Sequence, residues 1–230
     1  MNKTLAKIMQ WLVILTMPLL LGFGSFRLII SDAYPRYAYA KASFPPDFEW
    51  TNEQRLALAL VAVDYLERAE KAEDVIYLLE EQVKPGTNEP LYNAREIGHM
   101  LDVKRVADGL IRPLSWVGLG GVGVGVLALL ALDSSRRRLY AGMLWGGALT
   151  MAILLGIGLF LIVGWNTFFV AFHDLLFPAG TWTFPLTDSL IRLFPEKFWF
   201  DFGVILVTAI FMEGSLVAAV GYWLLSKGKV

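Results

Sequence analysis

The stretch PLSWVGLGGVGVGVLALLAL, residues 113–132, runs for 20 residues without a charged side chain. A helix of about 20 apolar residues crosses the hydrocarbon layer of a membrane, which is about 30 Å thick. Three more runs of this kind occur, with Arg27 and Glu213 as their isolated charges. We therefore predict an all-α integral membrane protein with four transmembrane helices, at residues 1–30, 113–132, 139–164 and 202–226.

The composition agrees with a membrane protein and excludes several other classes. Hydrophobic residues make up 56% of the chain and charged residues 18%, against about 45–50% and about 25% in soluble domains. A net charge of −1 argues against a nucleic-acid binder. The absence of cysteine excludes disulfides and thiolate catalysis, and two histidines are too few for a large His-ligated metal cluster.

The distribution of positive charge predicts the orientation. Seven Lys or Arg and one acid, Asp133, lie at the start of the first span, in the basic loop 133–138, and in the tail 227–230 that contains Lys229. The segments 31–112 and 165–201 together carry 12 basic and 19 acidic residues. The positive-inside rule then predicts cytoplasmic termini, with both long segments outside. The first span is too long for a signal peptide, so we interpret it as an uncleaved anchor.

The segment 31–112 is predicted to form a small extracytoplasmic helical head. Thr51 with Gln54, and Asn93 with Glu96, have the spacing of helix-capping boxes. A break in the helices is expected near Glu70–Asp74 and a turn at Pro85–Gly86, while Pro45–Pro46 argues against helix in residues 31–50.

The segment 165–201 is rich in both aromatic residues and proline. Its prolines argue against one long helix, and its aromatic residues against a solvated loop. We expect it to lie at the membrane interface and to line a groove open to lipid.

Two features inside the spans have simple structural explanations. Gly118, Gly120 and Gly123 match a nucleotide-binding pattern, but no strand precedes them, and close packing of helices explains them better. Glu213 lies in mid-span, where a structural hydrogen bond and a contact with a proton or a substrate amine remain equal alternatives.

The two histidines are the candidates for catalysis. The predicted topology brings His99 and His173 to the same membrane interface, although they are far apart in sequence. On a helix Asp102 shares a face with His99 and can hold one of its ring nitrogens, which leaves the other for proton transfer. Ordinary interfacial hydrogen bonding is an alternative role, and a metal held by both histidines and Asp102 or Asp174 is a weaker one.

Four sequence segments resemble the lipoprotein intramolecular transacylase family of four-span bacterial membrane proteins. They are REIGHMLDVK at 95–104, FHDLLF at 172–177, WTFP at 182–185 and DSLIRLFPEKFW at 188–199. The resemblance covers nearly the whole chain. It implies that His99 and His173 are catalytic and that the enzyme resides in the bacterial cytoplasmic membrane with its active site outside.

The resemblance also implies the reaction. The sn-2 acyl chain of a diacylglyceryl-cysteine lipoprotein would move to the α-amine of that cysteine, giving the lyso-form. A histidine pair can carry the proton, and no acyl-enzyme, metal or cofactor is required. The expected partners are the diacylated lipoprotein and membrane lipid, with no nucleic acid.

Two questions stay open at the level of sequence. The donor that stabilises the oxyanion is one of them, with Arg95, Lys104, Asn166 or a backbone amide as candidates. The class of function is the other, because a non-enzymatic membrane scaffold with a lipid groove, or less favoured a metal-dependent lipid hydrolase, also fits this composition.

Overall fold

The computed structural model describes residues 3–131 and 135–227, so Asp133 and Lys229 lie outside the described residues. Within the described ranges the chain is helical, and its only strand-like feature is an isolated antiparallel bridge between Val83 and Pro90. The chain divides into two compact units. The first comprises Met1–Leu28, Ile111–Ile162 and Val204–Val230, and the second comprises Ile29–Leu110 and Val163–Gly203.

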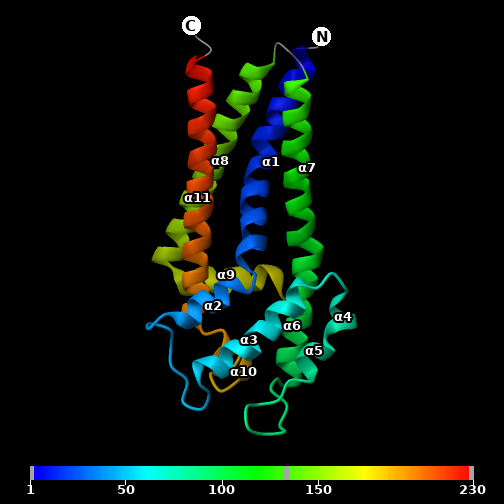
Figure 1. Cartoon of the computed structure of the whole chain (residues 1–230), viewed down its shortest axis with the longest axis vertical. Coiled ribbons are helices and arrows are strands. Elements are labelled where there is room, and N and C mark those ends of the chain that lie inside the picture. The colour runs from blue at the N-terminus through cyan, green and yellow to red at the C-terminus, as the bar shows by residue number, and fades with distance from the viewer. Residues whose placement is uncertain (1–2, 132–134, 228–230) are drawn as a thin grey trace. The chain divides into compact units, whose positions relative to one another are not determined.

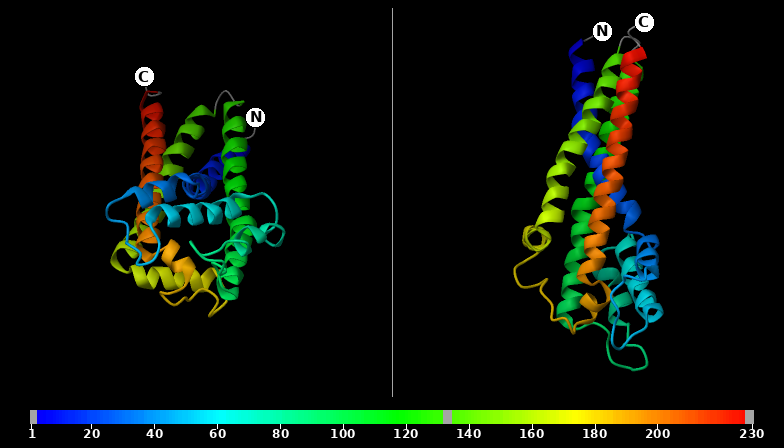
Figure 2. Two further views of the ribbon diagram at one scale, coloured as in Figure 1. Left: turned by 60° about the horizontal axis from the view of Figure 1, so that its bottom comes forward. Right: turned by 90° about the vertical axis from the view of Figure 1, so that its left-hand side faces the viewer.

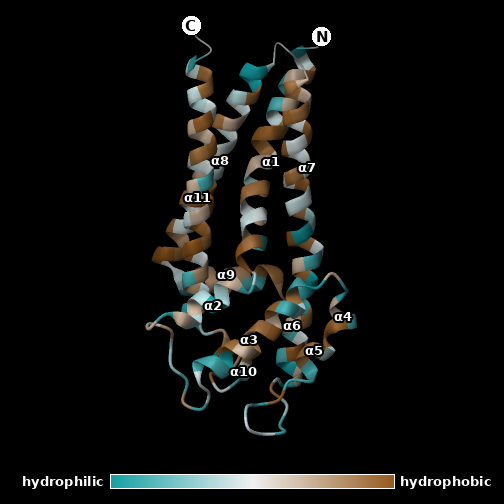
Figure 3. Ribbon diagram, viewed as in Figure 1, coloured by the Kyte–Doolittle hydropathy of each residue, from teal (hydrophilic) through white to brown (hydrophobic). Residues whose placement is uncertain are grey.

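Four long helices supply the first unit (Figure 1). All are long and apolar enough to cross a membrane, as the apolar runs predicted. Figure 3 shows hydrophobic residues along their length. The helices are α1 (Lys3–Ile29), α7 (Arg112–Leu130), α8 (Arg136–Val163) and α11 (Glu196–Lys227).

Glycine allows α7 to approach α1 closely. A Cβ atom added to Gly118 would collide with the backbone of Leu20, and one added to Gly121 would collide with the Thr16 side chain. The packing predicted for Gly118 is therefore confirmed. It is wrong for Gly120 and Gly123, which face open space, because the contact face follows the helical spacing of positions 118, 121 and 125.

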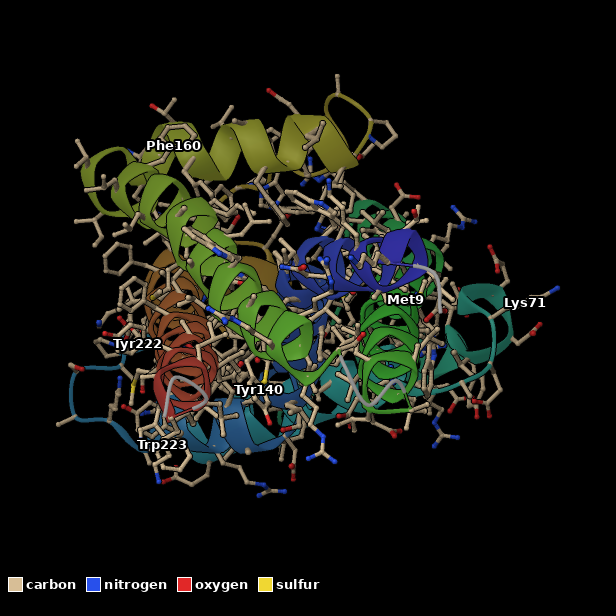
Figure 4. All side chains as sticks on the ribbon, turned by 90° about the horizontal axis from the view of Figure 1, so that it is seen from above. Met9, Lys71, Tyr140, Phe160, Tyr222 and Trp223 are labelled. Carbon is tan, nitrogen blue, oxygen red and sulfur yellow. The ribbon has the colours of Figure 1, made fainter. Side chains whose placement is uncertain are left out.

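Helix α8 packs on α1 and α11 in the same way. An added Cβ at Gly146 would lie 2.9 Å from Met17 Cβ. Met9 and Tyr140, labelled in Figure 4, pack at the edge of the apolar cluster of this unit, whereas Tyr222 and Trp223 are exposed. Residues Ala6, Val13, Met17, Leu129 and Leu139 form the buried part of that cluster.

Glu213 makes a hydrogen bond inside this unit. Ser25 Oγ of α1 donates to Glu213 Oε2 of α11 at 2.8 Å. This contact is the structural alternative proposed for Glu213, because a polar pair between helices satisfies both groups within an apolar surrounding.

The second unit contains short helices (Figure 2). Both predicted capping boxes are present, Thr51 with Gln54 and Asn93 with Glu96. The predicted turn is also present, with Gly86 at φ +78° and Thr87 N donating to Lys84 O at 3.1 Å. The helices are α2 (Ala33–Ala40), α3 (Asn52–Glu67), α4 (Ala72–Val75), α5 (Tyr77–Glu80), α6 (Ala94–Val106), the π-helical turn η1 (Ala107–Ile111), α9 (Trp165–Leu176) and α10 (Ser189–Leu193).

Helix α2 corrects the expectation that residues 31–50 contain no helix. Pro35 occupies the first turn of α2, where a backbone N–H has no helical partner in any case. Pro45–Pro46 lies in non-helical backbone, as expected. Residues 165–201 contain α9, α10 and the start of α11, with a proline-containing loop between α9 and α10, so one long helix is excluded as predicted.

Buried polar contacts hold the segment 188–198 within the second unit. Tyr39 donates its hydroxyl to Leu193 O at 2.6 Å, and the Arg55 guanidinium donates to Arg192 O. The Arg192 guanidinium in turn pairs with Asp47 at 2.7 Å, with both side chains buried. Because burial strengthens such contacts, they hold this proline-containing segment in a defined position.

Substituting Gly147 by alanine should destabilise the four-helix unit. The new Cβ would lie 2.8 Å from Ala218 N of α11 and would also meet Gly214 O, so overpacking should lower the free energy of unfolding by about 1–3 kcal/mol. Gly156→Ala on the same helix meets nothing within 4 Å and is the matched control. Thermal unfolding in detergent micelles measures the difference, and equal stability of the two variants would contradict this packing.

Candidate active site

His99 is positioned by the start of α6. The Asn93 side chain accepts hydrogen bonds from the backbone N–H groups of Arg95 and Glu96, which fixes where the helix begins. His99 follows Glu96 by nearly one turn and is 7% exposed. Its ring contacts Phe177 at 5.0 Å and Phe184 at 5.3 Å between centroids, so it lies in an apolar environment.

His173 lies near the end of α9 with its tautomer determined by one hydrogen bond. Its Nδ1 is 2.7 Å from Phe169 O, one turn earlier. Since a carbonyl oxygen only accepts, Nδ1 carries the proton, and in the neutral ring Nε2 carries the lone pair. The ring packs against Phe169 at 4.0 Å and Trp182 at 4.8 Å.

The structure brings the two imidazoles together within the second unit. Their centroids are 6.3 Å apart and their planes meet at 23°. Phe177 contacts both rings, at 5.0 and 5.5 Å. The two histidines of the chain therefore face one aromatic cage, which we define as Phe169, Phe177, Trp182 and Phe184.

The cage keeps both histidines neutral. Burial lowers the pKa of His99 to about 4, and the neighbouring His173 adds to this effect, while Asp102 opposes it. Burial also lowers the pKa of His173, opposed by its hydrogen bond to Phe169 and by Asp174. Both imidazoles are consequently uncharged at pH 7 and can accept a proton.

Asp102 does not hold a ring nitrogen of His99, so that sequence interpretation is wrong. Its Oδ1 accepts from Arg105 Nη1 at 3.0 Å, and His99 Nδ1 is buried without a hydrogen-bond partner among residues 3–131 and 135–227. A guanidinium three residues along the helix attracts the carboxylate more strongly than a neutral imidazole does. Asp102 acts on His99 through its charge alone.

The other candidates from the sequence differ in whether they contact the aromatic cage. Arg95 pairs with Asp188 at 2.6 Å and lies over Phe184 of the cage. Lys104 is fully buried and donates to Arg68 O at 2.7 Å. It follows His99 by five residues on α6, so it points from a different face of the helix. Asp174 is exposed next to His173, and Asn166 is exposed in the first turn of α9.

A metal centre finds no ligand set in the described part of the chain. No group of three His, Cys, Asp or Glu side chains there is arranged to hold an ion. Asp102, one of the carboxylates considered as a ligand beside the two histidines, accepts a hydrogen bond from Arg105.

Sequence reasoning missed the aromatic cage as part of the site. Phe169 and Phe177 precede and follow His173 by four residues, and this helical spacing is the signal that could have identified them. Trp182 gives no such signal, because a loop brings it to His173. Its Nε1 is buried without a partner among the described residues, and an unsatisfied donor of this kind costs about 1–3 kcal/mol.

Two hollows lie in the same unit. One, of about 350 Å³, has a polar lining that includes Asn93, Glu96 and Asp188, all close in sequence to the helix starts of α6 and α10. The other, of about 660 Å³, is mostly apolar and includes Trp165 and Phe200. Residues 165–201 supply most of the second lining, and a groove lined by this segment was predicted from its composition.

Comparison with known proteins finds one relative by sequence and solved structures with the same fold. A protein from Aquifex aeolicus of uncharacterised function is 25% identical over 217 residues, 94% of each chain. The solved lipoprotein intramolecular transacylase from Bacillus cereus superposes with a TM-score of 0.68 at 18% identity, over 99% of both chains. A variant of that protein with one histidine replaced gives 0.62 at 18% identity, over 98% of this chain and 94% of that one.

The family model described as lipoprotein intramolecular transacylase matches residues 9–199. This match includes both histidines, the aromatic cage, most of α1 and all of α7 and α8. The chain therefore belongs to the lipoprotein intramolecular transacylase family.

Proposed function

We propose that this acyltransferase moves the sn-2 acyl chain of a diacylglyceryl-cysteine lipoprotein to the α-amine of the same cysteine. The observation that carries the proposal is the pair of neutral imidazoles 6.3 Å apart in an aromatic cage. Such a pair suits a reaction that relocates one proton within one molecule. The apolar hollow of about 660 Å³ suits an acyl chain of the substrate.

His173 is the base in this mechanism. Its Nδ1–H donates to Phe169 O, so its Nε2 lone pair accepts the proton of the attacking amine. The amine nitrogen bonds to the ester carbonyl carbon, and the carbonyl electron pair moves onto oxygen. Proton removal by a positioned base contributes about 10²–10⁴-fold to the rate.

His99 serves the leaving side. As the tetrahedral intermediate collapses, the bond between the carbonyl carbon and the glycerol oxygen breaks, and the protonated His173 gives that oxygen the proton that it took from the amine. The neutral His99 stabilises the departing oxygen as a hydrogen-bond donor. Amine and ester belong to one molecule, so holding them in contact supplies much of the remaining acceleration.

The proposed orientation has both termini in the cytoplasm and the histidines outside. The start of α1, the start of α8 and the end of α11 lie at one end of the four-helix unit (Figure 1). These are the ends that carry Lys3, Lys7, Arg136, Arg137, Arg138 and Lys227. Their common position supports a positively charged cytoplasmic side, with the proposed boundaries 1–30, 113–132, 139–164 and 202–226 for the spans.

The direct test is N-acylation of a diacylated lipoprotein in a host that lacks N-acylation. The wild-type chain should yield an N-terminal lipopeptide with an acyl chain on the α-amine, measured by fragment masses. His173→Ala and His99→Ala should each lose about 10²–10⁴-fold in rate, since the first removes the base and the second removes the hydrogen-bond donor to the departing oxygen. Leu175→Ala, an exposed position on the same helix as His173, is the matched control and should retain activity.

A free α-amine after expression of well-folded wild-type protein would refute transacylation of that substrate. Binding of the lipoprotein without any reaction would then favour the scaffold alternative. Release of free fatty acid, abolished by a chelator, would favour the hydrolase.

The two histidines should titrate separately and both below pH 6.5. His99 should titrate at about 4, and His173→Ala should raise that pKa because a neighbouring positive charge is removed. NMR of the protein with isotope-labelled histidine measures both pKa values, since the chain contains two histidines and each gives its own signal. In the unfolded chain a histidine has a pKa of about 6.5, whereas folded His99 has a pKa of about 4. Between these values the unfolded chain binds more protons than the folded chain, so the free energy of unfolding should fall as the pH drops from about 6.5 toward 4. A His99 that titrates at or above 6.5 would contradict its burial.

A further inference from the structure

The indole N–H of Trp182 is a donor without an acceptor inside the candidate active site. Its Nε1 is buried and has no partner among the described residues. The ring is 4.8 Å from the His173 ring and 6.4 Å from Phe169. Buried donors in native proteins nearly always have a partner, and an exception calls for an explanation such as a catalytic role or a bound molecule that supplies the acceptor.

The loop before Trp182 is built to place this side chain. Thr181 N and Thr181 Oγ1 both donate to Pro178 O, at 3.2 and 2.9 Å. Gly180 within this turn has φ +81°, a conformation that other residues rarely adopt. The turn therefore directs the chain from the end of α9 back onto His173, against which the indole packs.

The charged donors of the region are already engaged. Lys104 donates to Arg68 O and pairs with Asp108. The Arg95 guanidinium pairs with Asp188 and is 45% exposed, where water weakens its effect. A neutral N–H fixed in an apolar cage stabilises developing charge more effectively than an exposed group, because it needs no reorganisation.

We infer that Trp182 is a further catalytic residue, whose indole N–H stabilises the oxyanion of the acyl transfer beside His173. This inference rests on the proposed function. When the amine nitrogen bonds to the ester carbonyl carbon, the carbonyl oxygen gains the electron pair and accepts a hydrogen bond from Trp182 Nε1. The bond strengthens in the transition state and returns to a weaker one as the glycerol oxygen departs.

Trp182→Phe tests the inference, because phenylalanine keeps an aromatic ring and lacks the N–H. We expect kcat for N-acylation of a diacylated lipopeptide to fall about 10²-fold, the effect of losing one oxyanion donor, with KM unchanged. Trp199→Phe, in the separate cluster of Phe194, Phe198 and Phe202, is the matched control and should keep kcat. Thermal unfolding in micelles verifies that both variants fold.

A second replacement separates the N–H from the shape of the ring. Benzothienylalanine at position 182 has sulfur in place of the indole N–H and nearly the same outline. It should lose as much kcat as Trp182→Phe. If the wild-type protein transfers the acyl chain and either replacement keeps full activity, the role of Trp182 is overturned and the proposed function is not. Failure of the wild-type protein itself would instead refute the proposed function.

Discussion

The carboxylate of Glu96 is the contact on which the arrangement of the second unit depends. Oε2 accepts from Asn93 N and completes the cap of α6, while Oε1 accepts from Leu190 N at 2.6 Å. One side chain, 1% exposed, thus joins the starts of two helices that are far apart in sequence. His99 follows on α6, and Arg95 reaches Asp188 across the same junction. Burial raises the pKa of Glu96, and the two backbone donors oppose that rise.

The membrane explains why so much of the fold follows from sequence. A span must satisfy its backbone internally and expose apolar side chains, so length and composition suffice to predict the four long helices. Helix caps are equally local, and both boxes form at the expected residues. Which face of a span meets its neighbour depends on the partner helix, and this is why Gly121 and not Gly120 contacts α1.

The candidate site was only partly accessible to sequence reasoning. That His99 and His173 would meet followed from the expected topology, not from their spacing. The partner of Asp102 did not follow, because Arg105 competes for the same carboxylate. Trp182 reaches the site through a turn, and the tautomer of His173 depends on a backbone oxygen of Phe169. Loop geometry of this kind carries no periodic signal.

The aromatic cage has a consequence for competition with bulk lipid. Hydrocarbon tails are present around a membrane enzyme at very high concentration and would fill an entirely apolar cage. Here a tail would leave the Trp182 N–H and the His99 Nδ1 unsatisfied, whereas an ester and an amine can satisfy both. Under the proposed function, these buried polar atoms would act as a filter, and their unsatisfied hydrogen bonds would become selectivity for lipids that present the reacting groups.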